Sequence, residues 1–244
     1  MLARLYFYLL IITLYSKTIF SADSRQPMQL AYDREKGTLT YKQGTPAQFD
    51  IFCESLLAYN PVVKLTISQV YFLDKKIVAF ATNLSRQHGT SLKSLMVCNN
   101  GLTHTSIITL LSYLPQLEEL DVSNNILSLS FDSATQMLKN EPNETLQPLA
   151  PAIAHLKKLY MNECSLTGDQ VGWIAEFLKT NTKLEVLSLI KNNIGVNDGT
   201  ISMLNLIHAA DTEGNPLKVL DLSFNHAQKP PSYTAKRKDL KVIV

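Results

Sequence analysis

The sequence lacks the short motifs that mark common kinds of catalysis. It contains no glycine-rich phosphate-binding loop, no H-E-x-x-H, no C-x-x-C and no G-x-S-x-G. None of the five histidines stands near another histidine or a cysteine at the spacing of metal ligands. We therefore expect no catalytic residues, no metal and no cofactor, and we expect that the protein is not an enzyme.

Glycine, cysteine and net charge are also low. Nine glycines among 244 residues argue against long flexible linkers, so we expect one domain. A net charge of +2 gives no general electrostatic reason to bind nucleic acid or a membrane surface. The three cysteines, Cys53, Cys98 and Cys164, are expected in a helix, on a sheet and in a turn. We do not expect a disulfide between such separate layers.

One sequence motif recurs along the chain, and its pattern, here called the frame, is L-x-x-L-x-[LVM]-x-x-[NC]-x-[LIA]. Successive copies begin 30, 25, 39, 28 and 33 residues apart. Repetition at intervals of about 20 to 50 residues is typical of solenoid proteins. The six copies, of which the first is the weakest, read VVKLTISQVYF from Val62, LKSLMVCNNGL from Leu92, LEELDVSNNIL from Leu117, LKKLYMNECSL from Leu156, LEVLSLIKNNI from Leu184 and LKVLDLSFNHA from Leu217.

Each copy predicts a short strand followed by a turn. In the copy at Leu117, Leu120 and Val122 alternate with polar residues, which predicts a half-buried strand with both side chains inward. Asn125 then turns the chain, and its amide can bond backbone groups that a buried turn leaves unpaired. Cys164 in that place predicts a buried thiol rather than a reactive one. The position is filled in the other copies by Val70, Asn100, Cys164, Asn192 and Asn225.

Between the strands the apolar period becomes helical. Residues 169–180 place Val171, Ile174, Ala175 and Leu178 on one stripe, and Asp169 is expected to be the N-cap of this helix. Further helices are predicted at 75–86, 105–114 and 198–210.

The frame resembles the leucine-rich repeat, and its spacing is similar to that of the ribonuclease-inhibitor-like subfamily. This resemblance implies an α/β leucine-rich-repeat solenoid (horseshoe), with a parallel concave sheet and convex helices, in about six repeats plus an N-terminal cap. We assign residues 62–228 to the repeats and 23–61 to a lead-in and cap, in which 37–61 predicts a strand followed by a helix. The cysteine-rich caps usual in extracellular members are absent; the repeats resemble intracellular and bacterial members.

The two ends of the chain lie outside the repeat. Residues 1–22 combine a basic start, an uncharged apolar run at 5–16 and a final alanine, which predicts a secretory signal peptide. The apolar run is shorter than the ~18 residues of a membrane span, although an uncleaved anchor or no export role are alternatives. Residues 229–244 form a basic tail, in which a truncated last strand at 240–244 would turn Leu240 and Val242 toward the core.

The third repeat is longer than its neighbours. Its extra residues fall within 139–151, KNEPNETLQPLAP, where three prolines predict an irregular excursion rather than a longer helix. Such an insertion is either a tolerated surface loop or a binding loop at the convex edge or rim.

Stacked strands place equivalent residues side by side at about 4.8 Å. The residues that directly follow the first leucine of each copy form one such column, and their charges alternate in sign. This alternation predicts a ladder of ion pairs that fixes the register of the strands. Its charged members are Lys93, Glu118, Lys157, Glu185 and Lys218.

The next outward columns mix apolar, amide and acidic groups, which is typical of a protein-binding surface. Asp121 and Asp221 share a column and, at four strand steps, are expected about 19 Å apart, too far for a pair of catalytic carboxylates. The candidate partner-binding residues of the concave face are Met96, Asp121, Tyr160, Asn162, Glu163, Ile190, Lys191, Asp221 and Phe224.

The sequence therefore predicts a non-catalytic module that binds another protein on its concave sheet and rim, without nucleic acid or a small-molecule substrate. We expect it to be exported, as a secreted protein or as a bacterial effector delivered to a host cytosol. One alternative is a regulator of a GTPase, since Ran GTPase-activating proteins are similar solenoids, although no arginine falls on a predicted strand or its following turn. Another is an envelope protein held in a membrane by an uncleaved N-terminal segment.

Overall fold

The computed structural model describes residues 28–71, 73–127, 129–132, 137–140, 146–195, 199–225 and 236–244, with backbone alone for 129–132, 137–140 and 199–200. The predicted signal peptide and the first part of the basic tail, 229–235, lie outside the described residues. Within the described part, no helix has the length and apolar composition needed to cross a bilayer.

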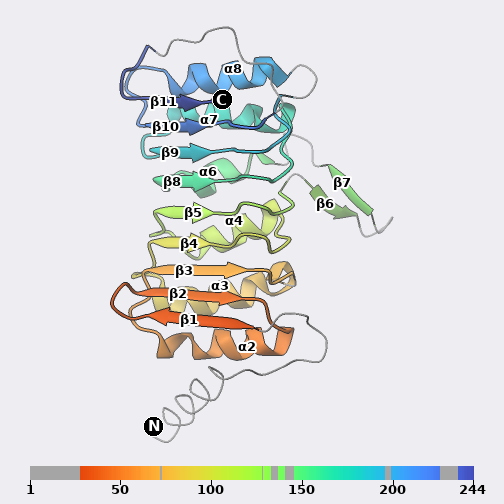
Figure 1. Cartoon of the computed structure of the whole chain (residues 1–244), viewed down its shortest axis with the longest axis vertical. Coiled ribbons are helices and arrows are strands. Elements are labelled where there is room, and N and C mark those ends of the chain that lie inside the picture. Colours follow the sequence, from red (N-terminus) through yellow and green to blue (C-terminus); the bar gives the residue numbers. More distant parts are fainter. Residues whose placement is uncertain are drawn as a thin grey trace, which may run out of the picture.

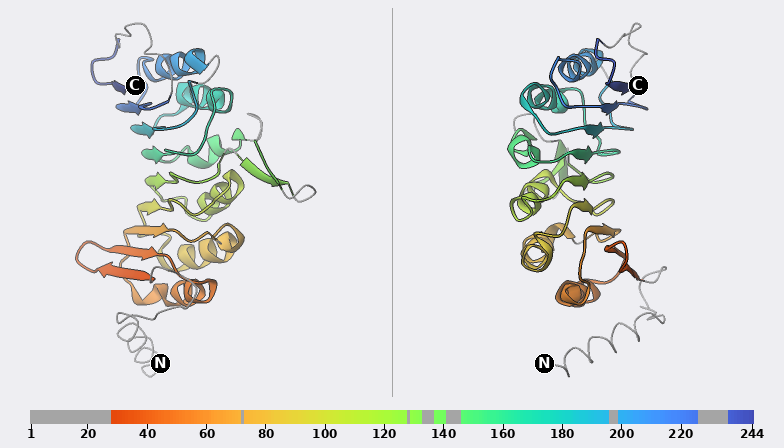
Figure 2. Two further views of the ribbon diagram at one scale, coloured as in Figure 1. Left: turned by 45° about the vertical axis from the view of Figure 1, so that its right-hand side comes forward. Right: turned by 90° about the vertical axis from the view of Figure 1, so that its left-hand side faces the viewer.

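The protein has an α/β fold in two layers, one sheet and one row of helices (Figures 1 and 2). The nine-stranded sheet has the order β1-β2-β3-β4-β5-β8-β9-β10-β11, and every neighbouring pair is parallel except β1 with β2. Its strands are β1 (Gln29–Asp33), β2 (Thr38–Lys42), β3 (Lys64–Ser68), β4 (Ser94–Met96), β5 (Glu119–Asp121), β8 (Lys158–Tyr160), β9 (Val186–Ser188), β10 (Val219–Asp221) and β11 (Lys241–Ile243).

The helices lie along one face of the sheet and leave the other face uncovered, as the right-hand view of Figure 2 shows. We call the uncovered side the open face; it is the one expected to be concave. The helices are α2 (Pro46–Ser55), α3 (Leu73–His88), α4 (His104–Ser112), α6 (Leu149–Ile153), α7 (Gly172–Thr180) and α8 (Gly199–Ala210), with short 3-10 turns η1 (Leu56–Ala58) and η2 (Asp169–Val171).

The core lies between the two layers and follows the repeated leucines. Leu65, Leu95, Leu120, Leu159, Leu187 and Leu220 are equivalent in the strand register and are at most 1% exposed. All six leucines belong to one continuous hydrophobic cluster. A single strand and helix could not bury its own apolar face, so each repeat depends on its neighbours. The six predicted repeat strands therefore coincide with β3, β4, β5, β8, β9 and β10.

The segment predicted to form the N-terminal cap differs from the prediction in one element. The strand and helix predicted within 37–61 are β2 and α2, and α2 begins at a capping box in which Thr45 and Gln48 bond each other's backbone. The preceding lead-in, however, contains β1, which pairs antiparallel with β2. Pairing with β1 gives β2, the first of the parallel strands, a partner for the backbone groups on its outer edge.

The insertion in the third repeat also differs. It is not irregular throughout: β6 (Leu129–Asp132) and β7 (Met137–Asn140) form an antiparallel hairpin that begins ten residues before the predicted start at 139. Figure 1 shows this hairpin beyond the ends of β5 and β8, on the side to which the parallel strands point. The five-residue helix α6 follows it and takes the place of the longer helices of other repeats.

The expected N-cap at Asp169 is wrong. Asp169 is the first residue of η2, and the reciprocal bonds are made two residues earlier, where Thr167 N donates to Gln170 Oε1 at 3.1 Å and Gln170 N to Thr167 Oγ1 at 3.4 Å. A Thr-x-x-Gln pair satisfies both backbone donors, which one aspartate cannot do.

Candidate functional site

The open face is organised by a turn that recurs after each repeat strand. The residue at the start of this turn has a left-handed backbone in all six repeats, with φ between 53° and 61°. We call this set the left-handed column: Gln69, Asn99, Asn124, Glu163, Lys191 and Phe224. The backbone N–H groups of its first five members donate to the next repeat, as Lys191 N does to Ser223 O at 2.9 Å. The column continues the sheet's bonding beyond the strands.

The residue after each member of the left-handed column points inward. We call this set the buried turn column: Val70, Asn100, Asn125, Cys164, Asn192 and Asn225. Asn192 Nδ2 donates to Met161 O at 2.8 Å and Leu189 O at 2.9 Å, while its Oδ1 accepts from Cys164 N at 2.9 Å and Leu166 N at 3.1 Å. Asn125 and Asn225 likewise bond backbone groups of two repeats, and Asn100 bonds those of the preceding repeat, which is the role the sequence predicts for them.

Cys164 interrupts this amide ladder. Its thiol is fully buried and donates weakly to Asn162 O at 3.3 Å and Val122 O at 3.5 Å. Burial raises the pKa of the Cys164 thiol to about 12, and burial likewise raises the pKa of Cys98. None of the three cysteines forms a disulfide. Neutral thiols of this kind are weak nucleophiles, so these two cysteines do not favour covalent catalysis.

The predicted charge ladder forms ion pairs on the open face. Glu118 lies between Lys93 Nζ at 3.4 Å and Lys157 Nζ at 2.8 Å, and Lys218 contacts Glu185 at 2.7 Å. The hydrogen bond from Lys157, followed by its charge, lowers the pKa of Glu118. One residue further along each strand, Lys158 and Glu119 make a similar pair at 3.7 Å, which the sequence reading did not identify although both signs stand in one column.

The strand register places four of the candidate residues in one column, which we call the central column. Met96, Asp121, Tyr160, Ser188 and Asp221 are successive partners across β4, β5, β8, β9 and β10. Asp121 and Asp221 are three strand steps apart rather than the four predicted from the sequence. Three steps of ~4.8 Å correspond to about 14 Å. This separation still exceeds that of paired catalytic carboxylates.

Tyr160 lies at the middle of the central column with Asp121 on one side and Ser188 on the other. Burial first, and then the nearby carboxylate of Glu119, raises the pKa of the Tyr160 hydroxyl. The hydroxyl therefore stays protonated at neutral pH and can donate a hydrogen bond to a partner.

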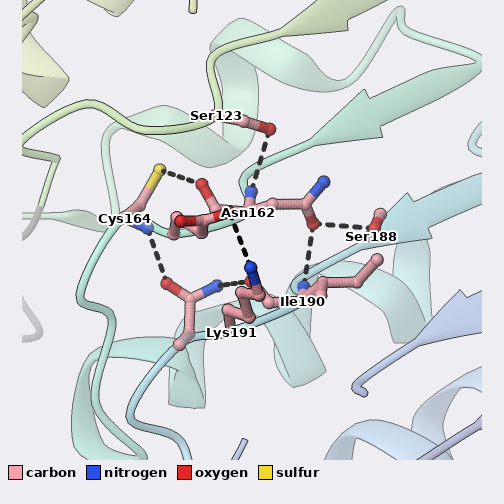
Figure 3. A network of polar contacts seen from close by, with 8 residues as sticks. Ser123, Asn162, Cys164, Ser188, Ile190 and Lys191 are labelled. Atoms are coloured by element: carbon pink, nitrogen blue, oxygen red, sulfur yellow. Dashed lines mark hydrogen bonds and ion pairs between the residues drawn. The ribbon is translucent and has the colours of Figure 1, made fainter. Parts of the chain in front are cut away.

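Asn162 has a structural role in addition to its predicted binding role. Figure 3 shows its Oδ1 accepting from Ser188 Oγ at 2.7 Å and from Ile190 N at 2.8 Å, while Asn162 N donates to Ser123 Oγ at 3.1 Å. These bonds link β5, β8 and β9 just beyond the strand ends. Ile190 and Asn162 are neighbours in this network, and both stay partly exposed.

The remaining candidates lie in the left-handed column. Glu163 and Lys191 form an ion pair at 3.4 Å, with each side chain about half exposed. Phe224 is 73% exposed, and its φ of 60° is a conformation that a bulky side chain rarely adopts. The structure thus places Met96, Asp121, Tyr160 and Asp221 on the sheet and Asn162 and Ile190 just beyond its strand ends, with Glu163, Lys191 and Phe224 along the rim.

Other kinds of site find little support in the described part of the chain. No three His, Cys, Asp or Glu side chains gather closely enough there to hold a metal ion. Its arginines are Arg34, Arg86 and Arg237, and none of them lies on a repeat strand. A depression of about 700 Å³ opens on the helix layer between α6 and α7, where Trp173 and Phe177 lie beside the short α6.

The chain is similar to known proteins both in sequence and in structure. No protein-family model matches the chain. NACHT, LRR and PYD domains-containing protein 5 of Mus musculus is 35% identical over 166 residues, which is 62% of this chain. The chain spans only 13% of that mouse protein. A structure of Leiomodin-1 Actin-Binding Site 2 has a TM-score of 0.45 and 15% identity, covering 68% of this chain and 90% of that one. The similarity to the mouse protein agrees with a leucine-rich-repeat type of α/β fold.

Proposed function

We propose that the protein is a non-catalytic leucine-rich-repeat module of the ribonuclease-inhibitor-like kind, which binds a partner protein on its open face and rim. The observation that carries this proposal is Phe224, an aromatic side chain that is 73% exposed at a position with φ of 60°. Asparagine or glycine would fit that backbone with less strain. A strained and exposed aromatic residue is a feature from which function can be inferred.

The surroundings of Phe224 support the same function. Ile190 and Tyr160 add apolar surface among the amide of Asn162 and the Glu163–Lys191 pair. Aromatic and aliphatic side chains set among polar groups are enriched where proteins bind one another. The ion-pair ladder at the other end of the strands satisfies its own charges and is expected to contribute little to recognition.

The test is capture of a partner by the full chain from cell extracts. Tyr160→Ala/Phe224→Ala should reduce capture at least fivefold, because truncating such anchors costs on the order of 1 kcal/mol or more. Ile201→Ala is the matched control, since Ile201 is 63% exposed on α8 in the helix layer. Equal capture by the double variant and the wild type would contradict the site and turn attention to the insertion at 139–151.

We further propose that the module is exported, in keeping with a bacterial effector, on the basis of the apolar run at residues 5–16. The N-terminal sequence of the mature protein tests this directly. A start near Asp23 supports export with cleavage, whereas an intact Met1 supports the anchored alternative.

A further inference from the structure

Most acidic side chains of the open face already have a cationic partner. Glu118, Glu119, Glu163 and Glu185 each lie within ion-pair distance of a lysine from a neighbouring repeat. In the described part of the chain, Asp121 and Asp221 lack such a partner, and both belong to the central column. The middle of the open face therefore has two carboxylates whose charge the protein does not neutralise there.

Both aspartates are held in the same way by the residue two positions later. Asp121 Oδ1 accepts from Ser123 N at 2.9 Å, and Asp221 Oδ1 accepts from Ser223 N at 3.0 Å and from Ser223 Oγ at 2.7 Å. These bonds orient each carboxylate through Oδ1, and the Cys98 thiol is a further, weak hydrogen-bond donor to the carboxylate of Asp121. A carboxylate that is held in place and has no cationic partner is a good acceptor for a guanidinium or ammonium group.

The spacing of the two aspartates fits an extended peptide. Three strand steps separate them, or about 14 Å. An extended chain rises about 3.4 Å per residue and places every second side chain on the same face, so residues i and i+4 would reach the two carboxylates. Residue i+2 would then lie above Tyr160 and Ser188, midway between them.

We infer that the open face binds an extended segment of its partner with two basic side chains four residues apart and an apolar side chain midway between them. This inference rests on the proposed function and specifies the chemistry of the partner. The basic groups pair with Asp121 and Asp221, and the middle side chain packs on the ring of Tyr160. The segment crosses β5, β8, β9 and β10 at right angles to the strands.

Selection from a random dodecapeptide display library on the immobilised full chain tests the inference. We expect enriched peptides to carry Arg or Lys at i and i+4 with an apolar residue at i+2. A fluorescein-labelled enriched peptide should bind Asp121→Asn/Asp221→Asn at least tenfold more weakly than wild type in anisotropy titrations. Glu176→Gln removes one charge from the exposed surface of α7 and should leave its affinity unchanged.

The asparagine substitutions keep the Oδ1 acceptors for Ser123 and Ser223, so an unchanged urea midpoint will show that the fold is intact. Basic residues at a helical spacing of about nine positions, or binding that survives the double substitution, would overturn the inference. Enriched peptides that lack the basic pair but bind Tyr160→Ala/Phe224→Ala more weakly than wild type would overturn the inference. That result would still support the proposed function. No enrichment would also overturn it, and the capture experiment would then judge the proposed function separately.

Discussion

The buried turn column and the left-handed column are adjacent in sequence and belong to the same turn. They differ in how far the fold restricts the residue type. The buried turn column contains four asparagines whose amides bond backbone groups of the preceding repeat, with Val70 and Cys164 at the other positions. The left-handed column has one backbone conformation but holds amide, acidic, basic and aromatic side chains. Stability therefore restricts residue type at one position and leaves it free at the next.

This difference shows where recognition can vary without loss of the fold. Side chains of the left-handed column point away from the core, so exchanging them changes the surface and leaves the packing of the core intact. Side chains of the buried turn column satisfy several backbone groups each, so exchanging them leaves donors and acceptors unpaired. Four substitutions test the contrast between these columns and the exposed charge ladder.

The largest effect is expected for Asn192→Ala. It removes the partners of Cys164 N, Leu166 N, Met161 O and Leu189 O, all in the interior. We expect the free energy of unfolding to fall by about 3 kcal/mol or more, because each unsatisfied buried group costs about 1–3 kcal/mol. Urea denaturation measures this loss. Lys191→Ala, one residue earlier, is the control and should change stability by less than about 0.5 kcal/mol.

Cys164→Ala should have a smaller effect than Asn192→Ala. The thiol makes only weak contacts with Asn162 O and Val122 O, so we expect a loss of about 1.5 kcal/mol. The same urea titration provides the comparison. A loss as large as that of Asn192→Ala would show that the sulfur replaces the amide fully and that the ladder has no weak point.

Phe224→Asn should stabilise the protein while weakening partner capture. Asparagine tolerates the left-handed backbone, which costs a bulky residue about 1 kcal/mol, so the unfolding free energy should rise by roughly that amount. Thermal unfolding and the capture experiment are run on the same preparation. If stability falls instead, the exposed ring contributes packing that its 73% exposure does not reveal.

The smallest effect is expected for Glu118→Gln in the exposed ladder. The lysine contacts lower the folded-state pKa of Glu118, so they stabilise the fold above the unfolded-state pKa. This contribution is lost as the pH falls through the lowered folded-state pKa. Wild type and variant should therefore differ slightly in urea midpoint at neutral pH and low salt, and should converge in acid or in concentrated salt. A difference that persists in acid would contradict the ion-pair explanation.

The repeat frame predicted much of the sheet and the composition of its open face. Six copies in register determined which side chains face outward, so Met96, Asp121 and Tyr160 appear where the alternation places them. The charge column likewise predicted the contacts of Glu118 with Lys93 and Lys157. Period-2 alternation succeeds here because a slip of one residue would expose every leucine.

Features outside the frame were predicted less well. The Thr167–Gln170 pair was visible as a Thr-x-x-Gln pattern, but the interpretation favoured the acidic residue beside it. The hairpin β6–β7 and strand β1 pair antiparallel with local partners, which a search for parallel repeats does not detect. The left-handed column could not be inferred from residue type, because Gln69, Glu163 and Phe224 share no chemistry and take their conformation from the turn.

The junction between β5 and β8 has a consequence for the cooperativity of unfolding. It coincides with the longest separation between copies, 39 residues, with the five-residue helix α6, and with Cys164 in place of an amide. In a linear array, stability is a sum of repeats and of the interfaces between neighbours. Native-state hydrogen exchange should therefore reveal a subglobal opening at this junction, with the strands on either side of it protected as two separate cooperative units.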